Sequence, residues 1–405
     1  MNSRTASVAT VMQYVAIVML IALTGFEYFY RNHQLIYLAL GPLSLYLAWI
    51  SRAGVRKGAV LFVGATVLLL GVQAVHFGLD LQIVFSGAVR FVIYLLVALG
   101  TARVFADKYI RVVYVLAVVS LVFYVPSQVS DSFHKFLLAV SSNIQPIGFG
   151  SVDVDQWTNP SNTLIIYTVP HLDVFRNSGP FWEPGMFGVF INIALAINVA
   201  RASQLWNKHN KVLLLSSLTT FSLGSLVASA LIVTYYYAFI KRSVVVGLSI
   251  LVAAPLLAAA LIQNDYFVAK IEANIHDVDK GYGRVGALLT HYAQIVESPL
   301  IGYGGGSLAD SQERLSEWTG VTPNGLSNIV RLYGIPFSML YYFLLYNFSQ
   351  WCVAQSKGGR NSCLLVFFVL LIVAFSQDVT TRHFYFVLTF LPLVVSSRLP
   401  RVRYE

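Results

Sequence analysis

The stretch Arg176-Asn-Ser-Gly-Pro-Phe-Trp-Glu-Pro-Gly185 is polar and rich in turn-forming residues, and a long apolar segment follows it directly. It places a cation, Arg176, and a carboxylate, Glu183, at the edge of that segment. Charged side chains at the boundary of a membrane segment are costly unless something pairs them or uses them. The rest of the chain must therefore supply a reason for both charges.

The composition excludes an ordinary soluble protein. Hydrophobic residues make up 57% of the chain and charged residues only 11%, whereas soluble proteins average about 25% charged residues. The basic residues behind the net charge of +9 stand in short clusters between apolar runs, as the topology signals of membrane proteins do. We therefore expect a polytopic integral membrane protein with no nucleic-acid partner. No metal-ligand spacing is visible, so we expect neither a metal nor another cofactor.

The apolar runs predict an all-α fold of about twelve transmembrane helices with both termini in the cytoplasm. Plain spans are expected near residues 8 to 29, 34 to 50, 59 to 76, 82 to 101, 112 to 128, 182 to 200, 244 to 262, 325 to 350, 362 to 377 and 384 to 397. Between Lys211 and Arg242 a single helix would be about 46 Å long, which is too long for one span.

Basic clusters at both ends of this stretch require an even number of crossings. We therefore expect two short helices with a turn near residues 221 to 225. Short, interrupted helices are tolerated in a membrane where their backbone is buried in protein or lines a watery cavity. The hydroxyl side chains at this turn are expected to face a cavity: Thr219, Thr220, Ser222 and Ser225.

Two polar segments are predicted to be long external loops of a single membrane domain, residues 1 to 405. They comprise residues 129 to 181 and residues 263 to 324, and loops of such length are usually functional. The second contains an amphipathic helix that Pro299 ends. Its apolar residues recur at helical spacing: Val285, Leu288, Leu289, Tyr292, Ile295 and Val296.

Several polar residues are candidates for chemistry. Arg284 and His291 are seven residues apart, so one helix face offers a cation and a proton acceptor to a single ligand. The alternatives are a snorkelling Arg284 at the membrane interface and a surface His291. Arg90 lies about 12 Å inside its predicted span, where a charge marks either a functional site or a structural ion pair. Asp378 lies in an external turn and is either a functional residue or an ordinary solvated loop residue.

The opening stretch has two interpretations. Pro180 and Pro184 favour a helix start, and Glu183 suits the positive end of that helix. This explanation leaves Arg176 without a role, whereas a guanidinium outside the membrane is a natural fork for phosphate oxygens. A desolvated Glu183 would also serve as a base. Asn324, before a later span, is either a helix cap or a sugar contact.

The opening stretch is the first of five motifs. It is followed by Thr220-Phe-Ser222, by Gly283-Arg284, by Glu297-Ser-Pro-Leu-Ile-Gly-Tyr-Gly304 and by Asn324-Gly-Leu-Ser-Asn-Ile-Val-Arg-Leu-Tyr-Gly334. In this order the motifs resemble the O-antigen polymerase (Wzy) and O-antigen ligase (WaaL) superfamily. The resemblance implies a glycosyltransferase-C-like enzyme of the bacterial inner membrane with a periplasmic active site. Its donor and acceptor would be undecaprenyl-diphosphate-linked glycans, with no nucleotide sugar.

The resemblance also implies roles for single residues. Arg176 and Arg284 would bind the donor diphosphate, and Arg90 is a further candidate for that role. Glu183 is the first candidate for the general base, ahead of His291 and Asp378. The residues expected to contact glycan are Trp182, Tyr282, Asn324 and Asn328.

The superfamily's ligases usually carry a histidine just before the Asn-Gly of the last motif. This chain has Pro323 there, which favours a polymerase that extends the glycan over a ligase or oligosaccharyltransferase. Membrane lipid and a chain-length regulator are the expected partners. A transporter is the alternative of another class, because about twelve spans with interrupted helices also suit a carrier. The long loops on one side and the lack of matching halves favour the enzyme.

Overall fold

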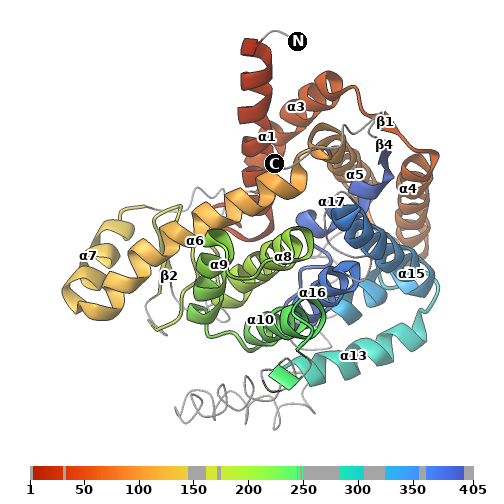
Figure 1. Ribbon diagram of the computed structural model, residues 1–405. Coiled ribbons are helices and arrows are strands. Elements are labelled where there is room, and N and C mark those ends of the chain that lie inside the picture. Colours follow the sequence, from red (N-terminus) through yellow and green to blue (C-terminus); the bar gives the residue numbers. More distant parts are fainter. Residues whose placement is uncertain are drawn as a thin grey trace. The chain divides into compact units, whose positions relative to one another are not determined.

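The computed structural model describes residues 3–30, 33–144, 161–170, 175–243, 245–246, 249, 283–304, 324–354 and 362–395. Within these residues the chain is almost entirely helical (Figure 1). Two short antiparallel ladders complete the secondary structure, one between β1 (Gly54–Val55) and β4 (Val394–Val395) and one between β2 (Ser161–Thr163) and β3 (Thr168–Pro170). The all-α prediction is confirmed.

Seven helices among the described residues are long and apolar enough to cross a membrane. They are α1 (Ser3–Gly25), α4 (Lys57–Phe77), α5 (Leu81–Thr101), α6 (Phe105–Val129), α8 (Pro184–Ala202), α10 (Leu223–Tyr235) with its π-helical extension η1 (Tyr236–Ile240), and α15 (Gly325–Val353). The shorter helices are α2 (Glu27–Tyr30), α3 (His33–Ser51), α7 (Asp131–Ser141), α9 (Lys208–Thr219), α13 (Gly283–Glu297), α16 (Ser362–Ser376) and α17 (His383–Phe390), which η3 (Leu391–Leu393) continues.

Seven such helices indicate a multi-pass membrane protein. The number of about twelve crossings stays a prediction. The predicted span at residues 244 to 262 lies almost wholly outside the described residues. The chain divides into two compact units, each built from three separate segments. Unit 1 comprises Met1–Leu43, Val104–Pro255 and Cys352–Val373, and unit 2 comprises Ser44–Arg103, Leu256–Trp351 and Ala374–Glu405.

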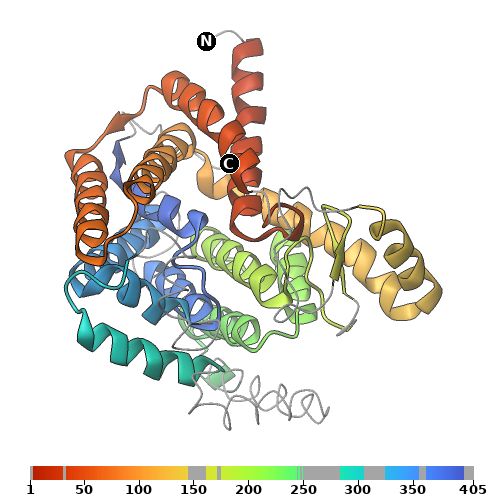
Figure 2. The ribbon, with the colours of Figure 1, turned by 180° about the vertical axis from the view of Figure 1, so that it is seen from behind.

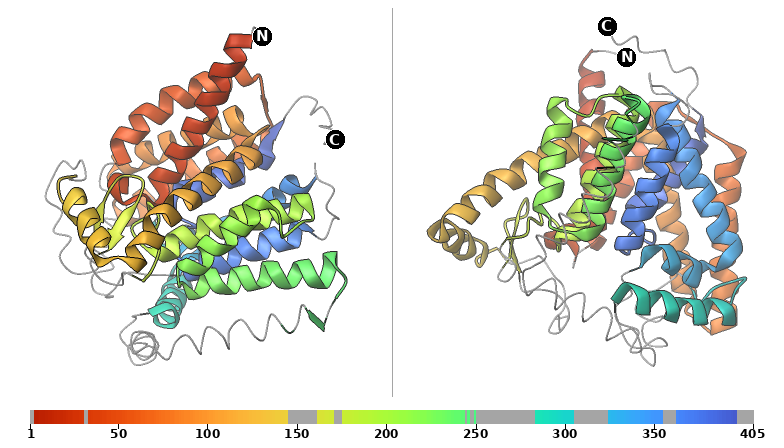
Figure 3. Two further views of the ribbon diagram at one scale, coloured as in Figure 1. Left: turned by 60° about the vertical axis from the view of Figure 1, so that its left-hand side comes forward. Right: turned by 60° about the horizontal axis from the view of Figure 1, so that its bottom comes forward.

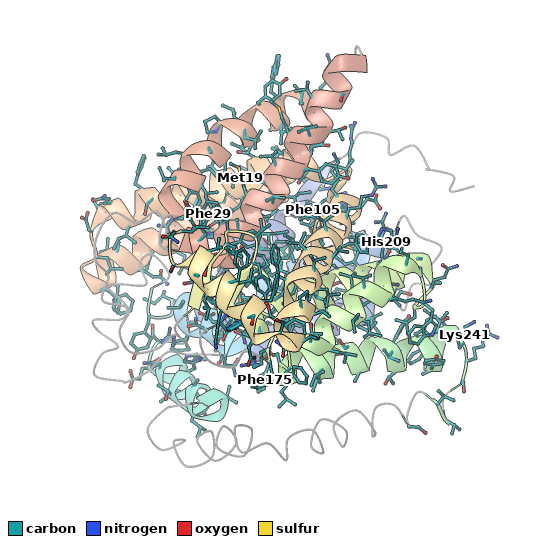
Figure 4. All side chains as sticks on the ribbon, turned by 90° about the vertical axis from the view of Figure 1, so that its left-hand side faces the viewer. Met19, Phe29, Phe105, Phe175, His209 and Lys241 are labelled. Carbon is teal, nitrogen blue, oxygen red and sulfur yellow. The ribbon has the colours of Figure 1, made fainter. Side chains whose placement is uncertain are left out.

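In unit 1, α8 is the buried centre and packs against α6, α9 and α10. The predicted turn is confirmed, because α9 ends at Thr219 and α10 begins at Leu223. Helix α9 is short as expected, whereas α10 with η1 is long enough to cross a membrane. Figure 4 shows His209 and Lys241 at one end of this helical pair and Phe175 at the other, where the Phe175 and Phe221 rings are 5.8 Å apart. The two basic ends of this helical pair therefore lie together, and the number of crossings stays a prediction.

Of the four hydroxyl side chains expected to face a cavity, Thr220, Ser222 and Ser225 are buried and Thr219 is half-buried; a cavity beside them stays a prediction. Asn192 of α8 donates to Ser217 at 3.0 Å and to Ser225 at 2.8 Å. Thr220 donates to the carbonyl of Ser217 at 2.7 Å. Asn192, Ser217 and Ser225 therefore satisfy one another's hydrogen-bonding groups without water. Figure 3 shows α8, α9 and α10 running alongside one another.

The described part of the first long loop carries structure of its own. Helix α7 and the β2–β3 hairpin pack against the end of α6. Their shared hydrophobic core contains Tyr124, Leu137, Tyr167 and Val169. This part of residues 129 to 181 therefore forms a small packed layer next to the membrane helices of unit 1.

In unit 2, α4 and α5 form a helical pair, and α17 packs on α5. Helix α15 is broken at Gly334, whose φ of 79° and ψ of 167° are not helical. Pro336 lacks an N–H donor, so the carbonyls near the break need other partners. The Leu332 carbonyl accepts from the Gln73 side chain at 2.8 Å and from the Gly304 amide at 3.1 Å. A crossing segment, residues 299 to 304, thus replaces the missing helical bonds.

Gly334→Ala should destabilise the protein by about 2 kcal/mol or more, because positive φ strains any other residue. The new Cβ would also overlap the backbone carbonyl of Leu300. Gly71→Ala is the matched control, since a Cβ at this helical position meets nothing within 4 Å. Thermal unfolding in detergent checks both variants. Equal Tm values for the two would contradict the account of the break.

Candidate functional site

The opening stretch is a structural junction of unit 1. The Asn177 side chain donates to Ser120 of α6 at 3.1 Å and to Thr219 of α9 at 3.0 Å. The Pro180 carbonyl accepts from the Glu27 amide at 3.1 Å. The stretch therefore joins the ends of helices that are far apart in sequence, which explains its turn-forming composition.

The structure gives each predicted site residue of this stretch a local position. Arg176 is buried, and its Nε donates to the carbonyl of Thr220 at 3.3 Å. A cation at the carboxyl end of α9 is favourable because free carbonyls gather there. The predicted helix start is confirmed, since α8 begins at Pro184 with Glu183 as its N-cap. Trp182 is half-buried, and the diphosphate and base roles of Arg176 and Glu183 stay predictions.

In unit 2, the first two turns of α15 carry a row of buried polar residues. The Asn324 side-chain oxygen accepts from the amides of Leu326 at 3.1 Å and Ser327 at 3.3 Å. The cap role of Asn324 is therefore confirmed. Arg331 is buried, and its Nε donates to the side-chain oxygen of Asn328 at 3.0 Å. Spacing of three and four residues places these side chains on one face of the helix.

Helix α13, which lies beside α15 (Figure 2), adds two more buried polar residues to this row. His291 is fully buried, and its Nδ1 is hydrogen-bonded to the Ser327 hydroxyl at 2.6 Å. Gln294, three residues on, is also buried. The alternative of a surface His291 is therefore wrong. We call His291, Gln294, Asn324, Ser327, Asn328 and Arg331 the polar cluster.

Burial, and to a smaller extent the positive charge of Arg331, together lower the pKa of His291 to about 3. Desolvation disfavours the charged imidazolium, and a neighbouring cation adds repulsion. His291 is therefore neutral at physiological pH. A neutral imidazole offers one donor and one acceptor, and Ser327 uses one of them.

Four buried atoms of the polar cluster have no hydrogen-bond partner within the described part of the chain: His291 Nε2, Gln294 Oε1, Asn324 Nδ2 and Asn328 Nδ2. Each such atom costs about 1 to 3 kcal/mol unless water or a ligand satisfies it. In His291, Asn324 and Asn328 the other polar side-chain atom is hydrogen-bonded. Water or a polar group of a ligand would satisfy these four atoms, which makes the polar cluster our candidate site.

The turn before α17 contributes a carboxylate to the same end of α15. Asp378 accepts from the Thr381 hydroxyl at 3.2 Å, and its negative charge acts on Arg331. Thr380 is buried and donates to the carbonyl of Gly325. The turn is therefore packed against α15, which is not the arrangement of an ordinary solvated loop.

Arg90 lies on α5, half-buried, and its charge acts on Tyr333 of α15. One turn further along, the Tyr94 hydroxyl is hydrogen-bonded to His383 Nδ1 at 2.5 Å. Arg90 thus belongs to unit 2 together with the polar cluster. Tyr282 and the side chain of Arg284 lie outside the described residues, although the Arg284 backbone is part of the first turn of α13.

Sequence reasoning missed Arg331, Gln294, Ser327 and the pair of Tyr94 with His383. Arg331 had a detectable signal, because it is a charge inside an apolar helix, the same criterion that selected Arg90. Its spacing from Asn324 and Asn328 was a second signal. Gln294 had none, since a lone glutamine on an amphipathic helix is usually solvated.

No family model matches the chain, and neither a curated protein nor a solved structure is significantly similar to it.

Acidification should destabilise the protein through His291. Its folded pKa of about 3 lies below the ordinary 6.5, so the unfolded chain binds more protons between these values. Stability is therefore complete above about pH 6.5 and should fall by about 2 kcal/mol by pH 5. Thermal unfolding of wild type and His291→Asn between pH 5 and 7.5 checks this. An equal loss in both proteins would contradict a buried neutral imidazole.

Proposed function

We propose that this protein is a lipid-linked glycan polymerase of the O-antigen type. It would transfer a growing glycan from undecaprenyl diphosphate to a new lipid-linked repeat unit at the periplasmic face of the inner membrane. The observation that carries the proposal is the buried guanidinium of Arg331, held by Asn328 at 3.0 Å beside side-chain donors that lack a partner among the described residues. The five sequence motifs support the same reaction class.

The polar cluster suits a substrate with an anionic head group. Arg331 supplies a cation with several donors in a fixed fork, and the amide nitrogens of Asn324 and Asn328 supply neutral donors. Preorganised donors act most strongly where charge develops in the reaction. In this transfer, the charge grows on the diphosphate that leaves the donor sugar.

The reaction is a single inverting displacement. The acceptor sugar hydroxyl attacks the anomeric carbon of the donor glycan, and a new carbon–oxygen bond forms. The bond from that carbon to the diphosphate oxygen breaks, and undecaprenyl diphosphate leaves with the electron pair. The hydroxyl proton passes to a protein base. The energy comes from the diphosphate linkage, so the proposal requires no nucleotide sugar and no cofactor.

Asp378 is the base that we favour in unit 2, because it is the carboxylate whose charge acts on Arg331. His291 is weaker in this role, since its low pKa makes it a poor proton acceptor. Glu183 of unit 1 stays the candidate that the sequence motif favours. Arg176, Arg284 and Arg90 remain proposed diphosphate contacts, and Trp182 and Tyr282 remain proposed glycan contacts.

The break in α15 also gives the carrier alternative a specific basis. Interrupted membrane helices with a charged residue at the break occur in secondary transporters, and α15 has Arg331 three residues before Gly334. A carrier would move a lipid-linked glycan without lengthening it. Ligase or oligosaccharyltransferase activity would instead join the glycan to a different acceptor.

Incubation of the purified protein in liposomes with a lipid-linked repeat unit alone tests the proposal. We expect a ladder of longer lipid-linked glycans. Lengthening or transfer only after addition of lipid A core or a protein acceptor would replace polymerase by ligase or oligosaccharyltransferase. Transbilayer movement of the unit without any ladder would support the carrier.

Arg331→Met should reduce ladder formation by about a hundredfold or more, because one lost donor to developing charge costs several kcal/mol. Arg331→Lys should restore only part of the activity, since the planar fork is lost. Arg56→Met is the matched control, because Arg56 is an exposed arginine of the same unit. Near-normal ladders from a folded Arg331→Met protein would remove the polar cluster from the reaction.

A further inference from the structure

Helix α13 turns its apolar side outward and its polar side inward. Leu289 is 55% exposed and Tyr292 is 66% exposed, with Leu288 and Val296 exposed beside them. His291 and Gln294 of the polar cluster are buried on the opposite side. A helix on a water-exposed surface has the reverse arrangement. The outward face therefore suits an apolar environment.

The described residues of α13 are too few to cross a membrane by themselves. Its 15 residues cover about 22 Å, which is less than the roughly 30 Å of a bilayer core. Only a helix that lies along the membrane boundary can present this much apolar surface to lipid without crossing.

The contacts that follow α13 place its end at such a boundary. Tyr303 stacks on Phe77, the last residue of α4, with ring centroids 6.1 Å apart. A Cβ at Gly304 would lie 3.6 Å from the side chain of Leu79, in the turn after α4. The chain therefore leaves α13 level with the end of a predicted span.

The neighbouring ends of α4 and α5 carry the same kind of surface. Val75 is 83% exposed and lies in the last turn of α4. Leu81 and Phe85 are exposed in the first turns of α5. Exposed large apolar residues on long apolar helices mark lipid contact. The outward face of α13 continues this lipid-facing surface at its boundary.

We propose that α13 lies in the membrane interface with Leu288, Leu289, Tyr292 and Val296 against lipid chains. The prenyl chain of a lipid-linked substrate then stays in the bilayer along this face, while its polar head reaches the cluster on the other side of the helix. The prenyl path rests on the proposed function for its substrate. The lipid contact of α13 does not.

Spin labels test the lipid contact. In a protein whose buried Cys352 and Cys363 are replaced by alanine, single cysteines are introduced by Leu289→Cys and Tyr292→Cys. Val75→Cys is the lipid control, and Asp80→Cys, in the exposed turn between α4 and α5, is the aqueous control. We expect both α13 labels to be accessible to oxygen and shielded from a water-soluble nickel complex, as at Val75. Labels that behave as at Asp80, or a disulfide between two copies through Leu289→Cys, would overturn the lipid contact.

Photo-cross-linking tests the prenyl path without requiring turnover. p-Benzoylphenylalanine is placed at position Tyr292 or, as control, at Leu68, which is exposed on the middle of α4. Radiolabelled undecaprenyl diphosphate is the probe, in phospholipid vesicles. We expect about tenfold more capture at Tyr292, because head-group binding concentrates the chain there. Equal capture at both positions would show bulk lipid only and would overturn the path. The liposome assay with a lipid-linked repeat unit tests the proposed function separately. If that assay gives no ladder of longer glycans, the proposed function is rejected, whatever the cross-linking result.

Discussion

The constraint on which this protein depends is that a polar group buried among apolar helices must find a partner. Around α8 and the opening stretch, unit 1 meets it with small side chains that hydrogen-bond to one another. Asn192 donates to Ser217 and Ser225, and Asn177 joins Ser120 to Thr219. Such fully satisfied networks fix one arrangement of helices. The same constraint makes unit 2 informative, because its polar cluster keeps four buried atoms without a partner among the described residues. The satisfied bonds explain how the helices of unit 1 are held together, and the gathering of four unpartnered atoms in one cluster indicates a candidate site.

The break in α15 connects the architecture of unit 2 to that site. A continuous helix would satisfy the carbonyls of Arg331 and Leu332 internally. The break gives them instead to Tyr303, at 2.8 Å, and Gly304, at 3.1 Å. This exchange fastens the segment after α13 to α15 just beyond Arg331. It also holds His291 against Ser327, since α13 leads directly into that segment. The crossing segment therefore connects the helix that carries His291 to the helix that carries Arg331, and Gln73 of α4 donates to both sides of this junction.

Much of the fold follows from local rules in the sequence. The turn at residues 220 to 222, the start of α8 at Pro184 and the cap at Asn324 all obey short-range signals, and they occur where predicted. The inward face of α13 could not be predicted, because periodicity separates two faces but does not say which one meets lipid. Burial of His291 needs a partner 36 residues away, and no local pattern encodes such a contact. Arg331 was within reach of sequence reasoning, since its charge interrupts an apolar run. The partners of the Ser225 hydroxyl could not be predicted either, because Asn192 and Ser217 lie on other helices.

We propose that the polar cluster of unit 2 receives the head group of a lipid-linked glycan. Structure determination in nanodiscs with a bound lipid-linked repeat unit would show this contact. We expect diphosphate or sugar oxygens within hydrogen-bond distance of Arg331 and of the Asn328 side-chain nitrogen. A bound repeat unit located elsewhere, with the atoms of the cluster satisfied by water alone, would contradict it.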